Sequence, residues 1–336
     1  MCGIAGIFAY HYPALHVDRD ELRLIRDNMQ ARGPDGFGEW FSSDGTVGLG
    51  HRRLAIIDLS ESGAQPMRTA CGRYVITFNG EIYNYRKLRQ QLEVKGYVFS
   101  SESDTEVLLH AFADAGVGML SQLRGMFALA LWDEVEHKML LARDPYGIKP
   151  LFVADDGWTC RFASQVKALT ASPKVSKTSD PAGVAGFYLL GSVPEPYTVF
   201  QEIRCLQAGH YQWVTAVGPE LPVQYASVSR VWADNSATES NLSPIDSEEA
   251  IRDALRASVR AHLVADVPVG AFLSAGIDSG ALVGMMRDCT AQPIKTITLG
   301  FTEFRGSAND ETQLAAEVAR LYQTEHTRRI DRKSVV

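Results

Sequence analysis

The sequence lacks cysteine pairs with the spacing of a metal site or of a disulfide framework. Its five cysteines are scattered, form no Cys-x-x-Cys pair and do not cluster with histidine: Cys2, Cys71, Cys160, Cys205 and Cys289. This pattern gives no support to a structural zinc ion. It favours a reducing compartment over an oxidising one.

Long apolar runs and an excess of basic residues are also missing. No stretch approaches the roughly 18 apolar residues of a membrane-spanning helix, and the N-terminus has no basic segment like that of a secretory signal. The formal net charge of −7 argues against nucleic acid or an anionic membrane as the main partner. The sequence therefore predicts a cytoplasmic protein whose partners are small molecules, with no nucleic acid and no membrane.

Two patterns of predicted secondary structure divide the 336 residues. Up to about residue 210, short apolar strands and amphipathic helices are typical of an α+β domain built on antiparallel sheets. Residues 211–247 are polar and lack a sustained period, which predicts a linker and an irregular edge segment. From 248 to 336 the order helix, strand, loop, helix, strand, helix indicates the start of a parallel α/β sheet.

The expected elements of the first domain are short. Strands are predicted at Thr46–Leu49, Ala55–Asp58, Tyr74–Phe78, Met126–Trp132, Met139–Ala142 and Leu151–Ala154, and helices at Glu21–Met29, Tyr85–Lys95 and Asp104–Ala115. In the second domain a helix starting near Ser247 is followed by strands at Val267–Leu273 and Ile294–Phe301 and by a last helix near Thr312–Tyr322.

The start of the chain carries a cysteine that can act as a nucleophile. Removal of Met1 leaves Cys2 with a free α-amine beside its thiol, so the thiolate can attack while the neutral amine takes and returns the proton. The reference pKa values of the two groups are close, about 8.5 and about 8. The alternative is an incidental residue near a frayed terminus.

A second candidate site is the loop Ser274–Gly280, between a predicted strand and a predicted helix. Small residues there let backbone N–H groups approach a phosphate, whose charge the helix N-terminus favours. It is not a Walker A loop, because no Gly-Lys-Ser/Thr follows. Asp278 can hold Mg²⁺ on a pyrophosphate, since a hard cation takes oxygen ligands. The alternative is an ordinary tight turn between strand and helix.

Several motifs together resemble a known family. The run from Val267 to Ser279 resembles the Ser-Gly-Gly-x-Asp-Ser pyrophosphate loop of ATP pyrophosphatases, and Cys2-Gly3-Ile4 resembles the start of class II glutamine amidotransferases. Four further segments fit in the same order: Arg32–Gly36, Gly50–Asp58, Phe78–Asn84 and Arg143–Leu151. Over nearly the whole chain the sequence resembles glutamine-hydrolysing asparagine synthetases.

The resemblance implies an N-terminal nucleophile-hydrolase domain at 1–210 and an α/β ATP-pyrophosphatase domain at 248–336. It implies that Cys2 is the glutaminase nucleophile and that the Asn79 side chain and the Gly80 N–H form the oxyanion hole. Arg53 would bind the glutamine α-carboxylate and Asp104 its α-ammonium, with backbone groups near Ile56, Ile57 and Glu81 contributing. The histidines receive no role.

Each of these residues also has a plainer explanation. Arg53 can be a surface ion-pair partner, and Asp104 can be the N-cap of its helix. Asn79-Gly80 is also a common hairpin turn. The assignment to one site depends on the motifs occurring together.

In the second domain the resemblance implies ATP as cofactor with Mg²⁺ on Asp278. The implied ATP-binding residues are Leu273, Ser274, Gly276, Asp278, Ser279, Leu299 and Gly300. The implied substrates are glutamine, ATP and aspartate, and the implied reaction transfers ammonia to an adenylated aspartate, giving asparagine, AMP and pyrophosphate. A homodimer is implied as well.

Two departures from the family pattern keep other functions open. Ala275 stands where the family usually has glycine and Gly280 where serine is common, and no later Gly-Gly-Asp-Glu segment occurs. We therefore expect a truncated synthetase half that is marginally stable unless a partner covers its parallel sheet. The alternatives are a glutaminase with an inert second domain, an amidotransferase for another carboxylate acceptor, and a non-enzymatic binding protein. A phosphoribosyl- or sugar-isomerase-linked amidotransferase would share Cys2, but the 274–280 loop counts against it.

Overall fold

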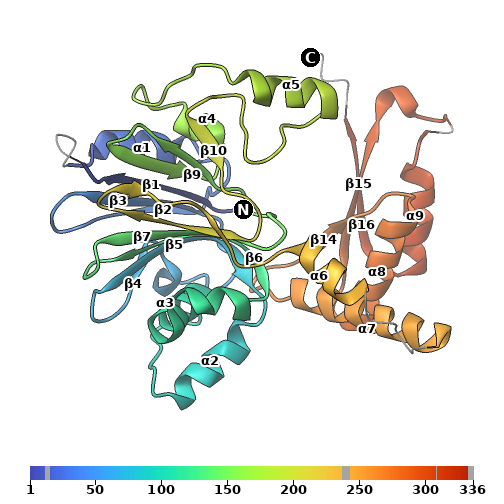
Figure 1. Cartoon of the computed structure of the whole chain (residues 1–336). Helices are drawn as coiled ribbons and strands as arrows, with labels where there is room; N and C mark the ends of the chain where they lie inside the picture. Colours follow the sequence, from blue (N-terminus) through green and yellow to red (C-terminus); the bar gives the residue numbers. More distant parts are fainter. Residues whose placement is uncertain (12–15, 237–242, 308, 332–336) are drawn as a thin grey trace. The chain divides into compact units, whose positions relative to one another are not determined.

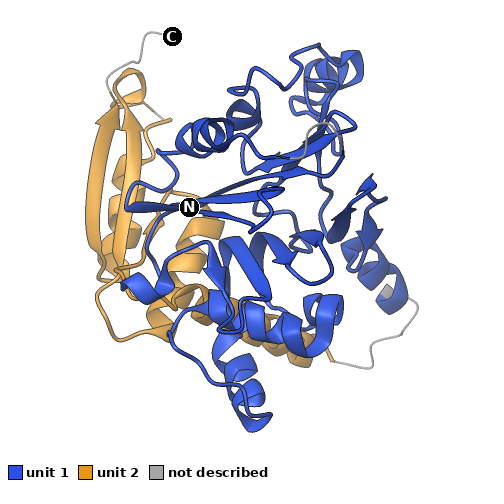
Figure 2. Cartoon of the chain, turned by 90° about the vertical axis from the view of Figure 1, so that its left-hand side faces the viewer, with its two compact units in different colours: residues 1–238 blue, residues 239–336 orange. Residues whose placement is uncertain are grey.

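The computed structural model describes residues 1–11, 16–236, 243–307 and 309–331. The chain divides into two compact units, Met1–Thr238 and Glu239–Val336, which are described separately (Figures 1 and 2). The division falls inside the segment predicted as linker, 211–247, of which 237–242 lie outside the described residues, as do 332–336 of the predicted second domain. The first part of that segment belongs to a sheet of the first unit, and its last residues begin a helix of the second.

Two antiparallel sheets form the centre of the first unit. The first has the order β10-β8-β9-β1-β3-β2, and the second has the order β12-β11-β7-β6-β5-β4, with β13 paired to β11. The strands of the first sheet are β1 (Gly3–Ala9), β2 (Gly36–Phe41), β3 (Val47–Arg53), β8 (Phe152–Asp155), β9 (Thr159–Ala163) and β10 (Ile203–Cys205). Those of the second are β4 (Met67–Arg68), β5 (Tyr74–Ile82), β6 (Gly125–Asp133), β7 (Lys138–Arg143), β11 (His210–Thr215), β12 (Gly218–Pro219) and β13 (Val223–Gln224).

The two sheets pack face to face around one apolar core. Ile4, Leu49 and Phe162 from the first sheet meet Trp132 and Leu141 from the second, and all five are fully buried. Strand alternation supplies this core, because every second residue of a strand points to the same face. The first and second sheets are stacked in Figure 1.

Helices cover the outer faces of both sheets. Helix α1 (Arg19–Asp27) buries Leu22 and Ile25 against the first sheet together with α4 (Val166–Leu169). Helix α3 (Asp104–Ala115) lies on the second sheet, where Phe112 packs edge-on against Tyr74, and α2 (Tyr85–Val94) packs against α3. The remaining helical segments are η1 (Glu61–Gly63), η2 (Gly116–Gln122), α5 (Pro181–Leu190) and α6 (Val228–Ser236). The predicted α+β class with helix-layered antiparallel sheets is confirmed.

The predicted strand at Ala55–Asp58 is wrong, because these residues form an irregular loop after β3. Asp58 adopts a positive φ of 49°, and its carboxylate accepts hydrogen bonds from Ser60 and from the Glu102 N–H. The Ala55 N–H donates to the Asp35 carboxylate rather than to a neighbouring strand. Side-chain acceptors therefore satisfy this backbone in place of a sheet ladder.

The second unit is a three-stranded parallel sheet with helices. Its elements are α7 (Pro244–His262), β14 (Gly270–Phe272), α8 (Ile277–Cys289), β15 (Lys295–Phe301), η3 (Thr302–Phe304), α9 (Thr312–Leu321) and β16 (Glu325–Asp331), with strand order β14-β15-β16. Leu273 and Val283 pack with Ala315 and Ala319 in one small core. Helix α7 begins earlier than predicted, at Pro244. Ser243 is its N-cap and forms a capping box with Asp246 in the first turn.

Strand β16 was not predicted. Its sequence is polar and charged, and six of its seven residues are exposed, so no hydrophobic alternation marks it. Within the described residues, no helix is both long enough and apolar enough to cross a membrane.

Candidate active site

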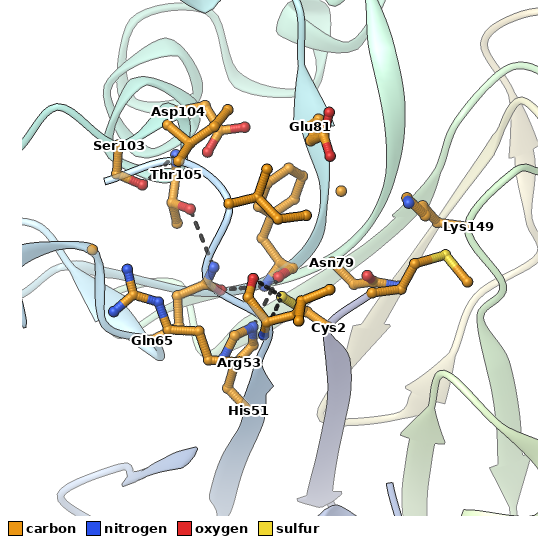
Figure 3. Close-up of a pocket in the computed structure, with 17 residues that line it drawn as sticks. Cys2, His51, Arg53, Gln65, Asn79, Glu81, Ser103, Asp104, Thr105 and Lys149 are labelled. Atoms are coloured by element: carbon orange, nitrogen blue, oxygen red, sulfur yellow. Dashed lines mark hydrogen bonds between the residues drawn. The ribbon is translucent and has the colours of Figure 1, made fainter. Parts of the chain in front are cut away.

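One pocket of the first unit collects the residues predicted for the first site (Figure 3). It is lined from both sheets and from the start of α3. Its lining includes Cys2, Arg53, Ile56, Ile57, Asn79, Gly80, Glu81 and Asp104. These residues are separated by up to about a hundred positions in the sequence, so their convergence is a property of the fold.

Cys2 precedes β1 and lies half-buried in this pocket. Its Sγ accepts a hydrogen bond from the Leu54 N–H at 3.3 Å and lies 3.5 Å from the Leu54 carbonyl oxygen. The Arg32 Nε donates to the Cys2 carbonyl oxygen at 2.9 Å, which fixes the backbone behind the thiol. Burial raises the pKa of the Cys2 thiol, while the Leu54 hydrogen bond and the Lys149 charge oppose that shift.

Asn79 is the most unusual polar residue of the pocket. Its side chain is 1% exposed, and neither Nδ2 nor Oδ1 has a hydrogen-bond partner in the part of the chain that the structure describes. Leaving a buried amide unpaired costs about 1–3 kcal/mol, so such a group is rarely retained without a ligand to satisfy it. Its Nδ2–H groups are available to an acceptor that enters the pocket.

Asn79 and Gly80 lie inside β5 and not in a hairpin turn, so the hairpin explanation is excluded. Gly80 faces Phe127 in the neighbouring strand β6. A Cβ at Gly80 would lie 2.2 Å from the Met126 carbonyl oxygen, and a Cβ at Gly125 would lie 2.2 Å from the Glu81 carbonyl oxygen. Glycine is required at both positions because the two backbones approach too closely for any side chain.

Asp104 is the first residue of α3, but it is not the cap of that helix. Ser103 occupies the N-cap position and its Oγ accepts from the Thr105 N–H at 3.2 Å. Asp104 instead accepts from the Ile82 N–H at 3.0 Å and is 5% exposed. Burial, reinforced by the Glu81 charge, raises the pKa of Asp104 to about 7.

The guanidinium of Arg53 is held by the loop that follows β3. It donates to the Ser60 carbonyl oxygen at 2.9 Å and to the Asp58 carbonyl oxygen. Neither partner is charged, so the Arg53 charge is not neutralised by them. A Cβ at Gly63 would lie 2.6 Å from the Arg53 Nη2, so this glycine makes the space that Arg53 occupies.

The pocket is also lined by polar side chains for which the sequence predicts no role, among them His51, Gln65 and Lys149. His51 is 1% exposed, bonds to the Phe78 carbonyl oxygen at 3.1 Å, and burial lowers its pKa to about 3. Gln65 joins β5 to α3 by accepting from the Phe78 N–H at 2.6 Å and donating to the Thr105 Oγ1 at 3.2 Å. Lys149 is 4% exposed and comes from the loop after β7. His51 and Lys149 lie in motifs of the sequence, Gly50–Asp58 and Arg143–Leu151, whereas Gln65 lies outside them.

The loop predicted for the second site follows β14 and leads into α8. Ser274 and Ser279 close it, with their Oγ atoms 2.9 Å apart and the Ser274 N–H donating to the Ser279 Oγ at 3.2 Å. Gly276 is the N-cap of α8, whose first N–H groups have no partner inside the helix. Ala275 does not adopt a positive φ, so its methyl group adds no backbone strain.

The other predicted residues of this site lie at the same edge of the sheet. Strands β14 and β15 are parallel, and the Leu273 N–H donates to the Ile297 carbonyl oxygen at 2.9 Å. Leu299 and Gly300 therefore follow at the carboxyl end of β15, next to the end of β14. Open parallel sheets bind ligands at this edge.

The metal prediction depends on Asp278 alone. Asp278 is exposed in the first turn of α8, and within the described ranges no group of three His, Cys, Asp or Glu residues is placed to hold a metal ion. Mg²⁺ is often bound by one or two carboxylates together with substrate phosphates. Asp278 fits a metal that arrives with a nucleotide and does not fit a preformed protein cage.

Comparison with protein families gives two adjoining matches. The family described as a glutamine amidotransferase domain matches residues 1–225, two thirds of the chain. The family described as asparagine synthase matches residues 250–333.

Individual relatives agree with these matches. Asparagine synthetase [glutamine-hydrolyzing] 1 of Bacillus subtilis is 36% identical over 95% of this chain and 48% of its own length. Asparagine synthetase [glutamine-hydrolyzing] 3 of the same organism is 32% identical over 97% of this chain and 53% of its own length. Amidase chry2 of Gibberella zeae is 32% identical over 95% of this chain and 49% of its own length. The chain thus spans about half the length of these relatives.

Among solved structures, the glutamine phosphoribosylpyrophosphate amidotransferase of B. subtilis has a similar fold. Its TM-score is 0.52 at 17% identity, with 99% of this chain and 91% of that chain covered. At this identity the likeness concerns the fold alone.

Proposed function

This chain belongs to the family of glutamine-hydrolysing asparagine synthetases, and we propose from that premise that its first unit hydrolyses glutamine with Cys2 as nucleophile. The observation that carries the proposal is the buried amide of Asn79, which has no hydrogen-bond partner among the described residues and lies in the same pocket as the Cys2 thiol. A nucleophile beside an unsatisfied donor is the arrangement that acyl transfer needs.

The proposed reaction proceeds through an acyl-enzyme. The Cys2 thiolate attacks the glutamine side-chain carbonyl carbon, and the oxygen that becomes negative accepts hydrogen bonds from Asn79 Nδ2 and the Gly80 N–H. The α-amine of Cys2, free once Met1 is removed, takes the proton from the thiol and passes it to the departing ammonia. Water then cleaves the thioester and releases glutamate.

Charge complementarity orients the substrate. The Arg53 guanidinium, held by backbone carbonyls of 58–60, is available to the glutamine α-carboxylate. The Asp104 carboxylate is buried at the start of α3, where an α-ammonium would relieve its desolvation. Figure 3 places Arg53 and Asp104 toward one side of the pocket and Lys149 toward the other, with Cys2 and Asn79 between them.

The second unit is proposed to bind ATP through the 274–280 loop, with Mg²⁺ on Asp278, and to activate a carboxylate acceptor. ATP supplies the adenylate that makes the carboxyl group reactive toward ammonia. Support comes from the asparagine synthase match and from the position of the loop at the carboxyl edge of β14 and β15. The family names of the relatives favour aspartate as the acceptor.

One assay tests both halves. The chain is incubated with glutamine, aspartate and Mg-ATP, and glutamate, asparagine and pyrophosphate are measured separately. Asparagine and pyrophosphate in equal amounts support the complete reaction. Glutamate alone supports a glutaminase and rejects the synthetase half for aspartate, and pyrophosphate release with another carboxylate would then identify a different acceptor. No glutamate release rejects the proposal.

We predict that glutamine binding weakens as the pH falls below about 7. The raised pKa of Asp104 means that the empty pocket holds a proton there, and this proton must leave before the carboxylate can bind an ammonium group. The Kd should rise about tenfold for each pH unit below 7. The measurement is calorimetric titration of a Cys2→Ala variant with glutamine between pH 5.5 and 8.5.

The same shift has a stability consequence of defined sign. Between pH about 4 and about 7 the folded chain keeps a proton on Asp104 that the unfolded chain releases, so this residue lowers the free energy of unfolding as the pH rises through that range.

An Asp104→Asn variant serves as the control for the binding prediction. It should bind glutamine weakly at every pH, and a Kd for the Asp104-containing protein that stays constant from pH 6 to 8 would contradict the prediction.

A further inference from the structure

The Arg143–Leu151 motif has no role in the reaction as proposed so far, although many hydrogen bonds fix its backbone. Asp144 is fully buried, and its Oδ1 accepts from the Tyr146 and Ile148 N–H groups at 3.0 Å each. Its Oδ2 accepts from the Lys149 N–H at 3.0 Å and from the Phe127 N–H at 3.2 Å. One carboxylate therefore gathers three N–H groups of the loop and ties them to β6.

Arg143 secures the same loop from its other side. Its Nε donates to the Lys149 carbonyl oxygen at 2.9 Å and its Nη2 to the Gly147 carbonyl oxygen at 2.7 Å. Gly147 has φ +66°, and a Cβ there would lie 2.8 Å from the Arg143 Nη2, so the tight loop requires glycine. Arg143 and Asp144, the two charged residues that open the motif, therefore both bind the backbone of the loop that ends at Lys149.

The side chain at the end of this loop enters the pocket. Lys149 is 4% exposed and lines the cavity with Cys2, Asn79 and Glu81. The anionic groups that act on its ammonium are the carboxylates of Glu81 and Asp144 and the Cys2 thiol. A lysine is rarely as buried as this, because a desolvated ammonium is costly, so its retention beside the Cys2 thiol calls for a function.

We propose that Lys149 is a positioning residue of the glutaminase site, held by the Asp144–Lys149 loop so that its ammonium keeps the reactive end of the pocket positive. This inference rests on the proposed glutaminase function and adds to it the residue that activates the nucleophile. A nearby cation stabilises the Cys2 thiolate, and it disfavours a proton on the neighbouring α-amine. Attack needs the thiolate, and the amine can take the proton from the thiol only if it starts neutral.

The charges around Cys2 are consistent with this role. Burial, with the charges of Arg32 and Lys149, lowers the pKa of the Met1 amine, which precedes Cys2. Lys149 also opposes the rise in the pKa of the Cys2 thiol that burial causes. Asp104, from the start of α3, acts on the thiol in the opposite direction. Burial lowers the pKa of Lys149 itself, and the carboxylates of Glu81 and Asp144 counteract that loss.

The other titratable groups that line the pocket do not replace Lys149. His51, on β3, is buried and neutral at ordinary pH because its pKa is about 3. Arg53, at the end of β3, donates to the carbonyl oxygens of the 58–60 loop. In Figure 3 it lies on the side of the pocket away from Lys149.

The test is the pH profile of Cys2 alkylation, which needs no glutaminase turnover. The full chain is treated with iodoacetamide from pH 6 to 10, and modification of the N-terminal peptide is followed by mass spectrometry so that Cys71 and Cys289 do not interfere. We expect Lys149→Met to shift the profile upward by about one pH unit, which is about a tenfold slower reaction at pH 7. Lys149→Arg should restore the profile, and Lys167→Met, which removes an exposed lysine of the same unit, should leave it unchanged.

Two outcomes would overturn the proposal. One is an unshifted profile in Lys149→Met, and the other is an equal shift in Lys149→Met and Lys149→Arg, which would mean that the side chain acts through packing and not through charge. A near-ultraviolet circular dichroism spectrum equal to that of the unmodified sequence shows that each variant is folded. If the chain releases no glutamate but the profile shifts as expected, the proposed function fails while the role of Lys149 at Cys2 stands.

Discussion

A Cys2→Ala variant should release no glutamate from glutamine above the uncatalysed rate. The proposed reaction has one nucleophile, and loss of an attacking side chain from a hydrolase site typically costs on the order of 10⁴-fold or more in kcat. Arg53 and Asp104 remain in place in the variant, so glutamine should still bind. The measurements are glutamate formation by a coupled assay and glutamine binding by calorimetry.

The control for this prediction is Cys71→Ala. Cys71 is exposed, and its contact is with the Thr69 hydroxyl at 3.4 Å, outside the pocket. This variant should keep full glutaminase activity. Intact-mass measurement should show that Met1 is absent from both variants, since the proposed base is the α-amine at position 2. Glutamate release by Cys2→Ala at more than a thousandth of the original rate would identify another nucleophile and reject the mechanism.

The second large effect is expected from Asn79→Ala. If its amide stabilises the developing oxyanion, its removal should lower kcat by about 10²–10³-fold, or about 2.7–4 kcal/mol, with a small change in KM. The stability of the protein should not fall by the cost of a lost hydrogen bond, because neither amide atom has a partner among the described residues. Steady-state kinetics and urea unfolding measure the two quantities.

Asn84→Ala provides the opposite pattern and therefore a matched control. Asn84 Nδ2 donates to the Gln122 carbonyl oxygen and its Oδ1 accepts from the Arg124 N–H, both at 2.9 Å. Its loss should destabilise the first unit by about 1–2 kcal/mol and leave kcat nearly unchanged. If Asn79→Ala instead lowered stability and kcat together, as a structural residue would, the oxyanion-hole assignment would be untenable.

Sequence patterns predicted the fold where burial is regular. The continuous apolar runs Met126–Trp132 and Met139–Ala142 lie within β6 and β7, where both faces of each strand are largely buried and one face fills the core between the sheets. Ala55–Asp58 has a similar apolar composition but lies where side-chain acceptors, chiefly Asp35 and Asp58, replace a partner strand. Strand β16 has no apolar alternation at all, so its sequence carries no pattern that would predict a strand.

The site was predictable only as a set of motifs. Cys2, Arg53, Asn79 and Asp104 were named from the sequence, and the structure gathers them in one pocket, but their catalytic roles stay predictions until tested. Gln65 was missed because its function is to join Phe78 to Thr105, residues that no local pattern connects. Lys149 lies within the Arg143–Leu151 motif, but no role could be predicted for it, because a sequence does not reveal that a lysine is buried.

The glycine pair of β5 and β6 limits how this site can change over evolutionary time. Because the space beside Gly80 and Gly125 is filled by backbone oxygens of the opposite strand, a side chain at either position would push the two strands apart and displace the Gly80 N–H. The position of the Gly80 N–H is therefore fixed by the strand pair. A substitution at either glycine should therefore disturb the strand pair itself, whereas a substitution in the loop that carries Lys149 leaves that pair in place.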